Sequence, residues 1–156
     1  MQIHRVGLAV TILGVAPLVA ASGQAVLAPS KRVLVVCDAL KEQMGDLTKM
    51  IPSVQNADER AGVTQLASVA ELNAERCLSI HSLLFAYEIV SVGEDKQKVG
   101  KLVAFRLGQY AAVKGDVDYA NQMVVLTKVP GIAREAQILR DRLRSLSVLT
   151  DSLRPR

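Results

Sequence analysis

The sequence predicts an all-α fold, a small bundle of about four to five mostly antiparallel helices with one intramolecular disulfide. Three observations predict it. Apolar residues recur every three or four positions in three long stretches, no useful stretch alternates with the period of two that strands show, and both cysteines fall inside the apolar stripes. The chain has 156 residues, 50% of them hydrophobic, which suits one compact domain, expected at residues 26–156.

Residues 1–25 have the three-part pattern of a secretory signal peptide. An arginine supplies the positive charge, residues 6–20 form an uncharged apolar run, and small residues follow. Cleavage after Ala21 or Ala25 fits the small side chains that signal peptidase accepts. We therefore expect a periplasmic or secreted bacterial protein. In the alternative, residues 6–28 remain as an uncleaved inner-membrane anchor, because 23 residues are enough to cross a bilayer.

The first two helices are expected to form an antiparallel hairpin. Ser30 can cap the first helix and Pro52 ends it, whereas the second starts near Asp58 and stops before Gly93. Both stripes alternate spacings of three and four, as in helices packed at shallow angles. The stripe of the first helix comprises Val33, Cys37, Leu40, Met44, Leu47 and Ile51. The stripe of the second comprises Val63, Leu66, Ala70, Asn73, Cys77, Ile80, Leu84 and Tyr87.

A third helix is expected to begin at Glu94 and to run to Lys114. Acidic side chains favour the positive end of a helix dipole, and Gly115 suits the C-terminal cap. Asp116 would then cap a fourth helix at about residues 117–128. The third and fourth helices are therefore predicted to be joined by a tight turn.

A local resemblance supports the same turn. Residues 107–120 resemble the middle of a tetratricopeptide repeat, with Leu107-Gly108, Gly115-Asp116 and Ala120 in the spacing of that family. The resemblance implies a helical hairpin over residues 101–128. It does not extend to a repeat array, because the flanking sequence does not recur with the period of that family.

The last helix follows Val129-Pro130-Gly131 and carries the third heptad-like stripe. That stripe comprises Ile132, Ala136, Leu139, Leu143, Leu146, Thr150 and Leu153. Such a stripe either faces the core of the bundle or pairs with a second copy of the chain.

The two cysteines are predicted to form a disulfide. Export would place Cys37 and Cys77 in an oxidising compartment, where a pair of cysteines normally joins. The register of the first hairpin gives an independent reason. If the chain turns near residues 55–56, Cys77 lies within one helical turn of the position that faces Cys37. Facing positions on packed helices have the Cα separation that a disulfide needs.

The sequence contains no recognisable catalytic, cofactor-binding or metal-ligating set. His81 is the one histidine after residue 25, and the positions three and four residues away hold no carboxylate. Of those neighbours only Cys77 could coordinate a metal, and it is assigned to the disulfide. We therefore expect no cofactor and no enzymatic activity. The net charge of +4 comes from mixed acidic and basic residues, so no nucleic-acid partner is expected either.

The function predicted from these features is that of an exported, non-enzymatic helical module of the bacterial cell envelope, acting on another envelope protein or on a second copy. One alternative is a ligand- or cofactor-binding bundle around His81, Asn73 and Arg106, the polar residues at or near core positions. Another is a membrane-surface protein, because a basic face of the last helix could contact lipid or an acidic partner. That face consists of Arg134, Arg140, Arg142 and Arg144.

Overall fold

The computed structural model describes residues 27–110 and 113–153, which form five α-helices and no strand. The helices are α1 (Pro29–Met50), α2 (Ala57–Ile89), α3 (Glu94–Gln109), α4 (Val113–Leu126) and α5 (Pro130–Ser152), and a short 3-10 turn (Ile51–Ser53) follows α1. The prediction of an all-α bundle is confirmed. The signal peptide predicted at residues 1–25, with its two cleavage sites, lies outside the described residues.

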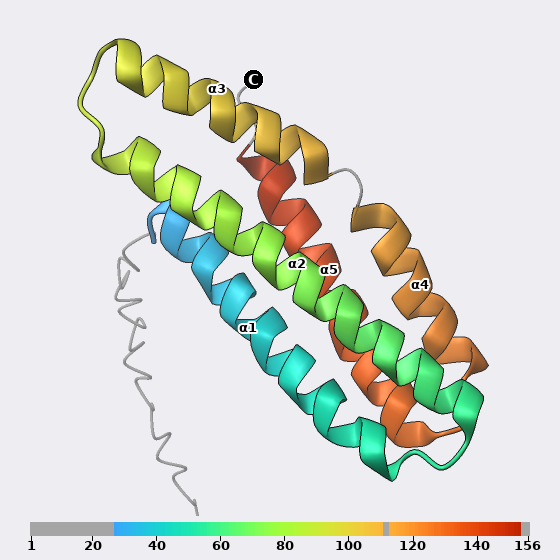
Figure 1. The fold of residues 1–156 in the computed structure, drawn as a ribbon. Coiled ribbons are helices and arrows are strands. Elements are labelled where there is room, and N and C mark those ends of the chain that lie inside the picture. The colour runs from blue at the N-terminus through green and yellow to red at the C-terminus, as the bar shows by residue number, and fades with distance from the viewer. Residues whose placement is uncertain (1–26, 111–112, 154–156) are drawn as a thin grey trace, which may run out of the picture.

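Helices α1 and α2 pack along their length as the predicted antiparallel hairpin (Figure 1). Pro52 lies in the 3-10 turn after α1, and Asn56 caps α2 by accepting hydrogen bonds from the amides of Asp58 and Glu59 at 2.9 and 3.0 Å. The side chains of Cys37 and Cys77 are fully buried and lie at disulfide-bonding distance, with their Cα atoms 5.4 Å apart. The predicted register of the hairpin is therefore confirmed.

The predicted helical hairpin over residues 101–128 is wrong. Helix α3 ends at Gln109 and α4 begins at Val113, so Gly115 lies inside α4 and does not end a helix. A C-terminal cap glycine normally has a positive φ, which in the described residues is found at Gly93 alone. Helices α3 and α4 instead follow one another along α2, which contacts both (Figure 1).

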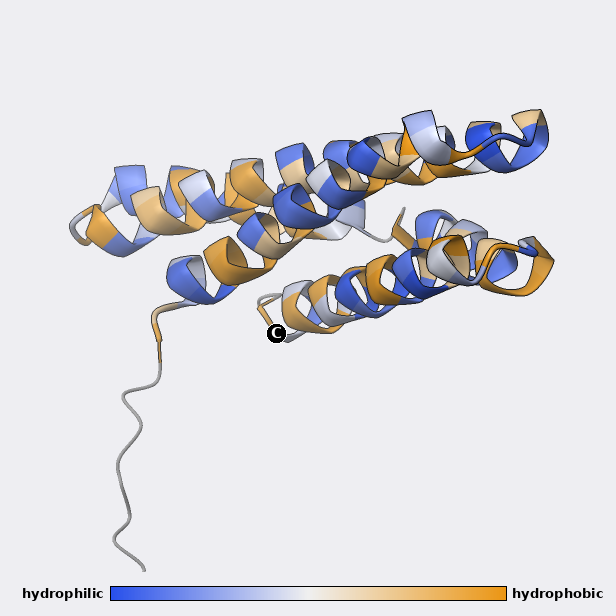
Figure 2. Cartoon of the chain, turned by 90° about the horizontal axis from the view of Figure 1, so that it is seen from below, coloured by the Kyte–Doolittle hydropathy of each residue, from blue (hydrophilic) through white to orange (hydrophobic). Residues whose placement is uncertain are grey.

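Helix α5 packs against α4 and α1 and closes the bundle. The stripe expected on this helix faces the core, because Ile132, Leu139 and Leu146 are fully buried. Figure 2 shows polar and apolar residues alternating along the helices, as is typical of amphipathic helices around one core. The described helices thus form one bundle around a single core, in which α3 and α4 together cover α2.

The start of α1 differs from the sequence prediction. Ala28 occupies the N-cap position without a side-chain hydrogen bond, and Pro29 is the first helical residue. Ser30 is buried, and both its amide and its hydroxyl donate to the carboxylate of Glu88 near the end of α2, at 2.8 and 2.5 Å. The capping group of α1 is therefore supplied by α2, through a contact between residues far apart in the sequence.

Candidate binding cleft between α2 and α3

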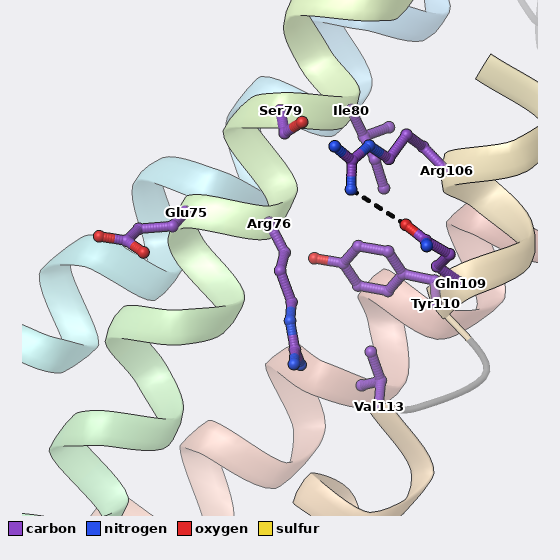
Figure 3. Close-up of a pocket in the computed structure, with 8 residues that line it drawn as sticks. All are labelled: Glu75, Arg76, Ser79, Ile80, Arg106, Gln109, Tyr110 and Val113. Carbon is purple, nitrogen blue, oxygen red and sulfur yellow. Dashed lines mark hydrogen bonds between the residues drawn. The ribbon is translucent and has the colours of Figure 1, made fainter. Parts of the chain in front are cut away.

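A hollow of about 480 Å³ lies between α2 and the C-terminal part of α3 (Figure 3). It is open to solvent on one side and combines polar with apolar walls. Its lining residues are Glu75, Arg76, Ser79 and Ile80 from α2, Arg106 and Gln109 from α3, Tyr110 directly after α3, and Val113 at the start of α4. A volume of this size falls within the range of small-ligand and side-chain sites in proteins.

Two guanidinium groups enter this cleft from opposite walls. Figure 3 shows Arg106 reaching from α3 toward Ser79, and its Nη1 atom donates to the side-chain oxygen of Gln109 at 3.0 Å. Within the described residues, no carboxylate lies within ion-pair distance of Arg106. Glu75 is directed away from the other lining residues (Figure 3). The guanidinium of Arg106 therefore keeps donors available for an acidic ligand.

Arg76 is held in place by a carboxylate behind the cleft. Its Nη1 atom lies 3.4 Å from an oxygen of Asp116 on α4, and the same oxygen accepts a hydrogen bond from the side-chain amide of Asn73 at 2.9 Å. Arg76 is about 41% exposed, so the pair is partly solvated and contributes little to stability. Its effect is to orient the Arg76 side chain along the cleft wall.

Tyr110 forms the floor of the cleft. Its ring is buried, and its hydroxyl donates to the backbone carbonyl of Asn73 at 3.2 Å. Burial raises the pKa of Tyr110 far above its ordinary value, so the phenol is neutral at any physiological pH. The hydroxyl is therefore a fixed hydrogen-bonding group that joins the end of α3 to α2.

Asn73 lies behind the cleft and does not line it. Its side-chain nitrogen donates to the backbone carbonyl of Val69 at 2.8 Å as well as to Asp116, whereas its side-chain oxygen is buried without a partner among the described residues. His81 lies on the side of α2 that faces α1, where its Nδ1 atom is 3.0 Å from the carbonyl of Ser30 and its ring stacks on Phe85. Of the three polar residues singled out from the sequence, only Arg106 lines the cleft.

The basic face predicted on α5 is largely engaged within the molecule. Arg142 donates to the backbone carbonyl of Ala39 and lies 3.4 Å from Glu42, both on α1. Arg140 pairs with Asp141 at 2.9 Å, and Arg144 lies 4.0 Å from the same carboxylate. These arginines hold α5 against α1 or neutralise a neighbouring acid.

On α5 the remaining groups offer little surface for a partner. Arg134 is exposed, and Val148, at 70% exposure, is the one strongly exposed large apolar residue within Pro130–Ser152. The apolar stripe of this helix is buried, so it does not form the long patch that a second copy would need.

The sequence did not indicate that Arg76, Ser79 and Tyr110 meet Arg106. The one sequence signal for this part of the cleft is that Arg76 and Ser79 lie one helical turn apart on the same side of the apolar stripe of α2. Their partners come from α3, and pairing the two faces requires knowing that α3 packs on α2 over this length.

Comparison with protein-family models, with curated proteins and with solved structures finds no match to this chain. In residues 27–110 and 113–153, no cluster of three or more His, Cys, Asp or Glu side chains is arranged to hold a metal ion. None of the helices that the structure describes is both long and apolar enough to cross a membrane. The function of the cleft is therefore inferred from the residues that line it.

Proposed function

We propose that this chain is an exported, non-enzymatic helical module of the bacterial cell envelope, and that its α2–α3 cleft binds an acidic group of a protein partner. The observation that carries the proposal is the guanidinium of Arg106, which projects into an open cleft without a carboxylate partner among the described residues. Arginine presents its donors in a planar fork that matches a carboxylate.

The surroundings of Arg106 suit a protein ligand. Ser79 adds a hydroxyl on the opposite wall, and Arg76, which is paired with Asp116, adds further guanidinium donors. Leu102 and Phe105, on α3 close to Arg106 in sequence, are 53% and 62% exposed and would extend the contact beyond the charged group. Arginine and aromatic residues are the types that most often dominate binding energy at protein interfaces.

The cellular part of the proposal rests on the sequence. The signal-peptide pattern of residues 1–25 supports export, and export supports a covalent bond between Cys37 and Cys77. The absence of enzymatic activity is proposed because the one histidine after residue 25 packs against a backbone carbonyl of α1. A role for α5 at a membrane surface is less well supported, since most of its arginines already contact other parts of the chain.

Site-specific photo-cross-linking in intact cells tests this proposal. A photoreactive residue at Ser79, on the cleft wall, should give a discrete adduct, and the same residue at the exposed Val148 of α5 should not. An adduct of twice the chain mass would identify the partner as a second copy. Equal labelling at the two positions, or no adduct at either, would refute the proposed contact surface.

Charge variants then test the role of the guanidinium. Arg106→Ala should weaken partner binding by about 10- to 100-fold, the range typical of interface hot spots, and Arg106→Lys should restore only part of it because lysine lacks the fork. Arg134→Ala removes an exposed arginine from α5 and is the matched control. Binding that is equally sensitive to both alanine variants would show a general charge effect and not a site.

A further inference from the structure

A second hollow, of about 570 Å³, lies at the end of the bundle where α1 begins and α2 and α5 end. We call it the end pocket. Its walls are mostly apolar and come from three helices and the residue after a fourth: Pro29 of α1, Leu84 and Tyr87 of α2, Val103 of α3, and Leu153, which follows α5. Figure 1 shows α3 running back along the last part of α2, at the end of the bundle where α1 begins. An apolar cavity of this size between helices is typical of small-molecule sites.

Two ionisable side chains of opposite charge also reach the end pocket, and they do not form an ion pair with each other. Both carboxylate oxygens of Glu88 accept hydrogen bonds from Ser30, which engages this carboxylate with the start of α1. The Nζ atom of Lys96 lies 4.9 Å from the centre of the Tyr87 ring, which fixes the ammonium group at the pocket wall.

The acids nearest to Lys96 in sequence pair with a different lysine. Glu94 and Asp95 each lie 3.7 Å from the Nζ atom of Lys98. Within the described residues, no carboxylate lies within ion-pair distance of Lys96. The end pocket therefore combines apolar walls with an ammonium group that has no ion-pair partner among the described residues, and this group could pair with the head group of an anionic amphiphile.

Gly100 determines how closely the walls approach each other. A Cβ atom at this position would lie 3.2 Å from Cε2 of Tyr87, which is tighter than an ordinary contact. A larger side chain at position 100 would therefore occupy the space beside the Tyr87 ring. A substitution at Gly100 therefore fills part of the end pocket without replacing Lys96 or Glu88.

We propose that the end pocket binds a single-chain amphiphile with an anionic head group, of the fatty-acid class. The hydrocarbon chain lies among the apolar walls, and the carboxylate pairs with the ammonium group of Lys96. This site is separate from the α2–α3 cleft and uses none of its residues, so it holds whether or not the cleft binds a protein.

Calorimetric titration of the exported protein with saturated fatty acids, kept below their micelle concentrations, tests the proposal. Affinity should rise about three- to fourfold for each added methylene, as expected for burial of hydrocarbon, until the chain fills the pocket. Dodecanoate should bind about fivefold more tightly than dodecanol, which has the same chain without the charge. Acetate, which has the charge without the chain, should not bind. Affinity that is independent of chain length would overturn the proposal.

Four variants locate the binding on the chain. Lys96→Gln should weaken dodecanoate binding about fivefold, whereas Lys98→Gln, on the same helix but paired with its own acids, should leave it unchanged. Gly100→Leu should weaken it more than tenfold while the circular dichroism spectrum remains helical. Arg106→Ala should have no effect, which separates this result from a failure of the cleft. Equal losses in both lysine variants would place the ligand elsewhere and overturn the proposal.

If something other than a fatty acid occupies the end pocket, the binding experiments should give different results. If the apolar segment at residues 6–20 occupied the end pocket, the chain that retains residues 1–25 would not bind dodecanoate, and the chain cleaved after Ala25 would. If a second copy occupied it, sedimentation would show a dimer that Gly100→Leu dissociates and dodecanoate leaves intact. Either result would overturn the assignment to a fatty acid.

Discussion

Removing the covalent link between Cys37 and Cys77 should destabilise the fold by several kcal/mol. The two residues are 40 positions apart, and closing a loop of that length lowers the entropy of the unfolded chain by an amount worth about 4 kcal/mol at 25 °C. Both side chains are fully buried. On reduction the Cys77 thiol has an acceptor in the carbonyl of Val33, 3.6 Å away. The predicted loss therefore reflects the cross-link.

Urea denaturation of the oxidised and reduced protein measures this loss. With an m-value of about 2 kcal/mol/M, the midpoint should fall by about 2 M on reduction. The Cys37→Ala/Cys77→Ala double variant should unfold near the reduced protein and should not respond to reductant. Mass spectrometry without reductant should find no free thiol in the exported protein. Equal midpoints before and after reduction, or two free thiols, would refute the cross-link.

Three further predictions concern single contacts. Glu88→Ala removes the acceptor for the amide and hydroxyl of Ser30 at the start of α1 and should cost about 1–2 kcal/mol in chemical denaturation. A hydrogen bond from the hydroxyl of Thr127 lowers the pKa of Glu59, together with one from a backbone amide, so the stability that this carboxylate contributes is present above pH 4.5 and lost as the pH falls below it. Glu59→Gln should therefore lose less stability on acidification than the wild type, as measured by thermal unfolding across that range. Leu139→Ala, in the buried stripe of α5, should cost about 2–5 kcal/mol.

Matched controls accompany these variants. Glu71 lies on the exposed face of α2, and Glu71→Ala should change stability by less than about 0.5 kcal/mol. Glu71→Gln is the control for the measurement across pH. Its loss of stability on acidification should resemble that of the wild type more closely than the loss in Glu59→Gln does. Val148→Ala, on α5 but 70% exposed, is the control for Leu139→Ala. A loss at Val148 as large as that at Leu139 would show that the stripe of α5 is not the buried side of the helix.

The sequence predicted the parts of the fold that depend on local spacing. The stripes containing Cys37, Cys77 and Leu139 are largely buried, with Tyr87 as the exposed exception, and the two cysteines face each other as the hairpin register required. These predictions succeed because a helix repeats its face every three or four residues, so a one-dimensional pattern determines which side is buried. A short loop between two long helices then determines the pairing.

Contacts between distant residues could not be predicted in this way. Serine is a residue type that often caps its own helix, yet Ser30 donates to Glu88 across the hairpin. Glycine is a residue type that often follows the end of a helix, yet Gly115 is an internal residue of α4. In both cases tertiary packing overrides a local preference that is worth only about 1 kcal/mol.

The end of α3 is the clearest case of such control, and it also creates the candidate cleft. No glycine or proline follows Gln109 directly, so local sequence offers no signal for the end of the helix. Asn73 of α2 forms hydrogen bonds with residues on both sides of the junction between α3 and α4. Its backbone carbonyl accepts from the hydroxyl of Tyr110, and its side-chain amide donates to Asp116 of α4. One buried residue thus fixes the end of α3 and the start of α4 on α2.

The same anchoring orients the charged walls of the cleft. Because Asp116 is held by Asn73, it can also position Arg76, and because Tyr110 is held there too, the last turn of α3 directs Arg106 over the opposite wall. The side-chain oxygen of Asn73 is buried without a partner in the part of the chain that the structure describes, at a cost of about 1–3 kcal/mol. An apolar residue would pack in this position without that cost and would keep the backbone carbonyl that Tyr110 uses, but it would remove the amide that holds Asp116 in place beside Arg76. The buried amide is therefore explained by the geometry that it imposes on the cleft, and not by a gain in stability.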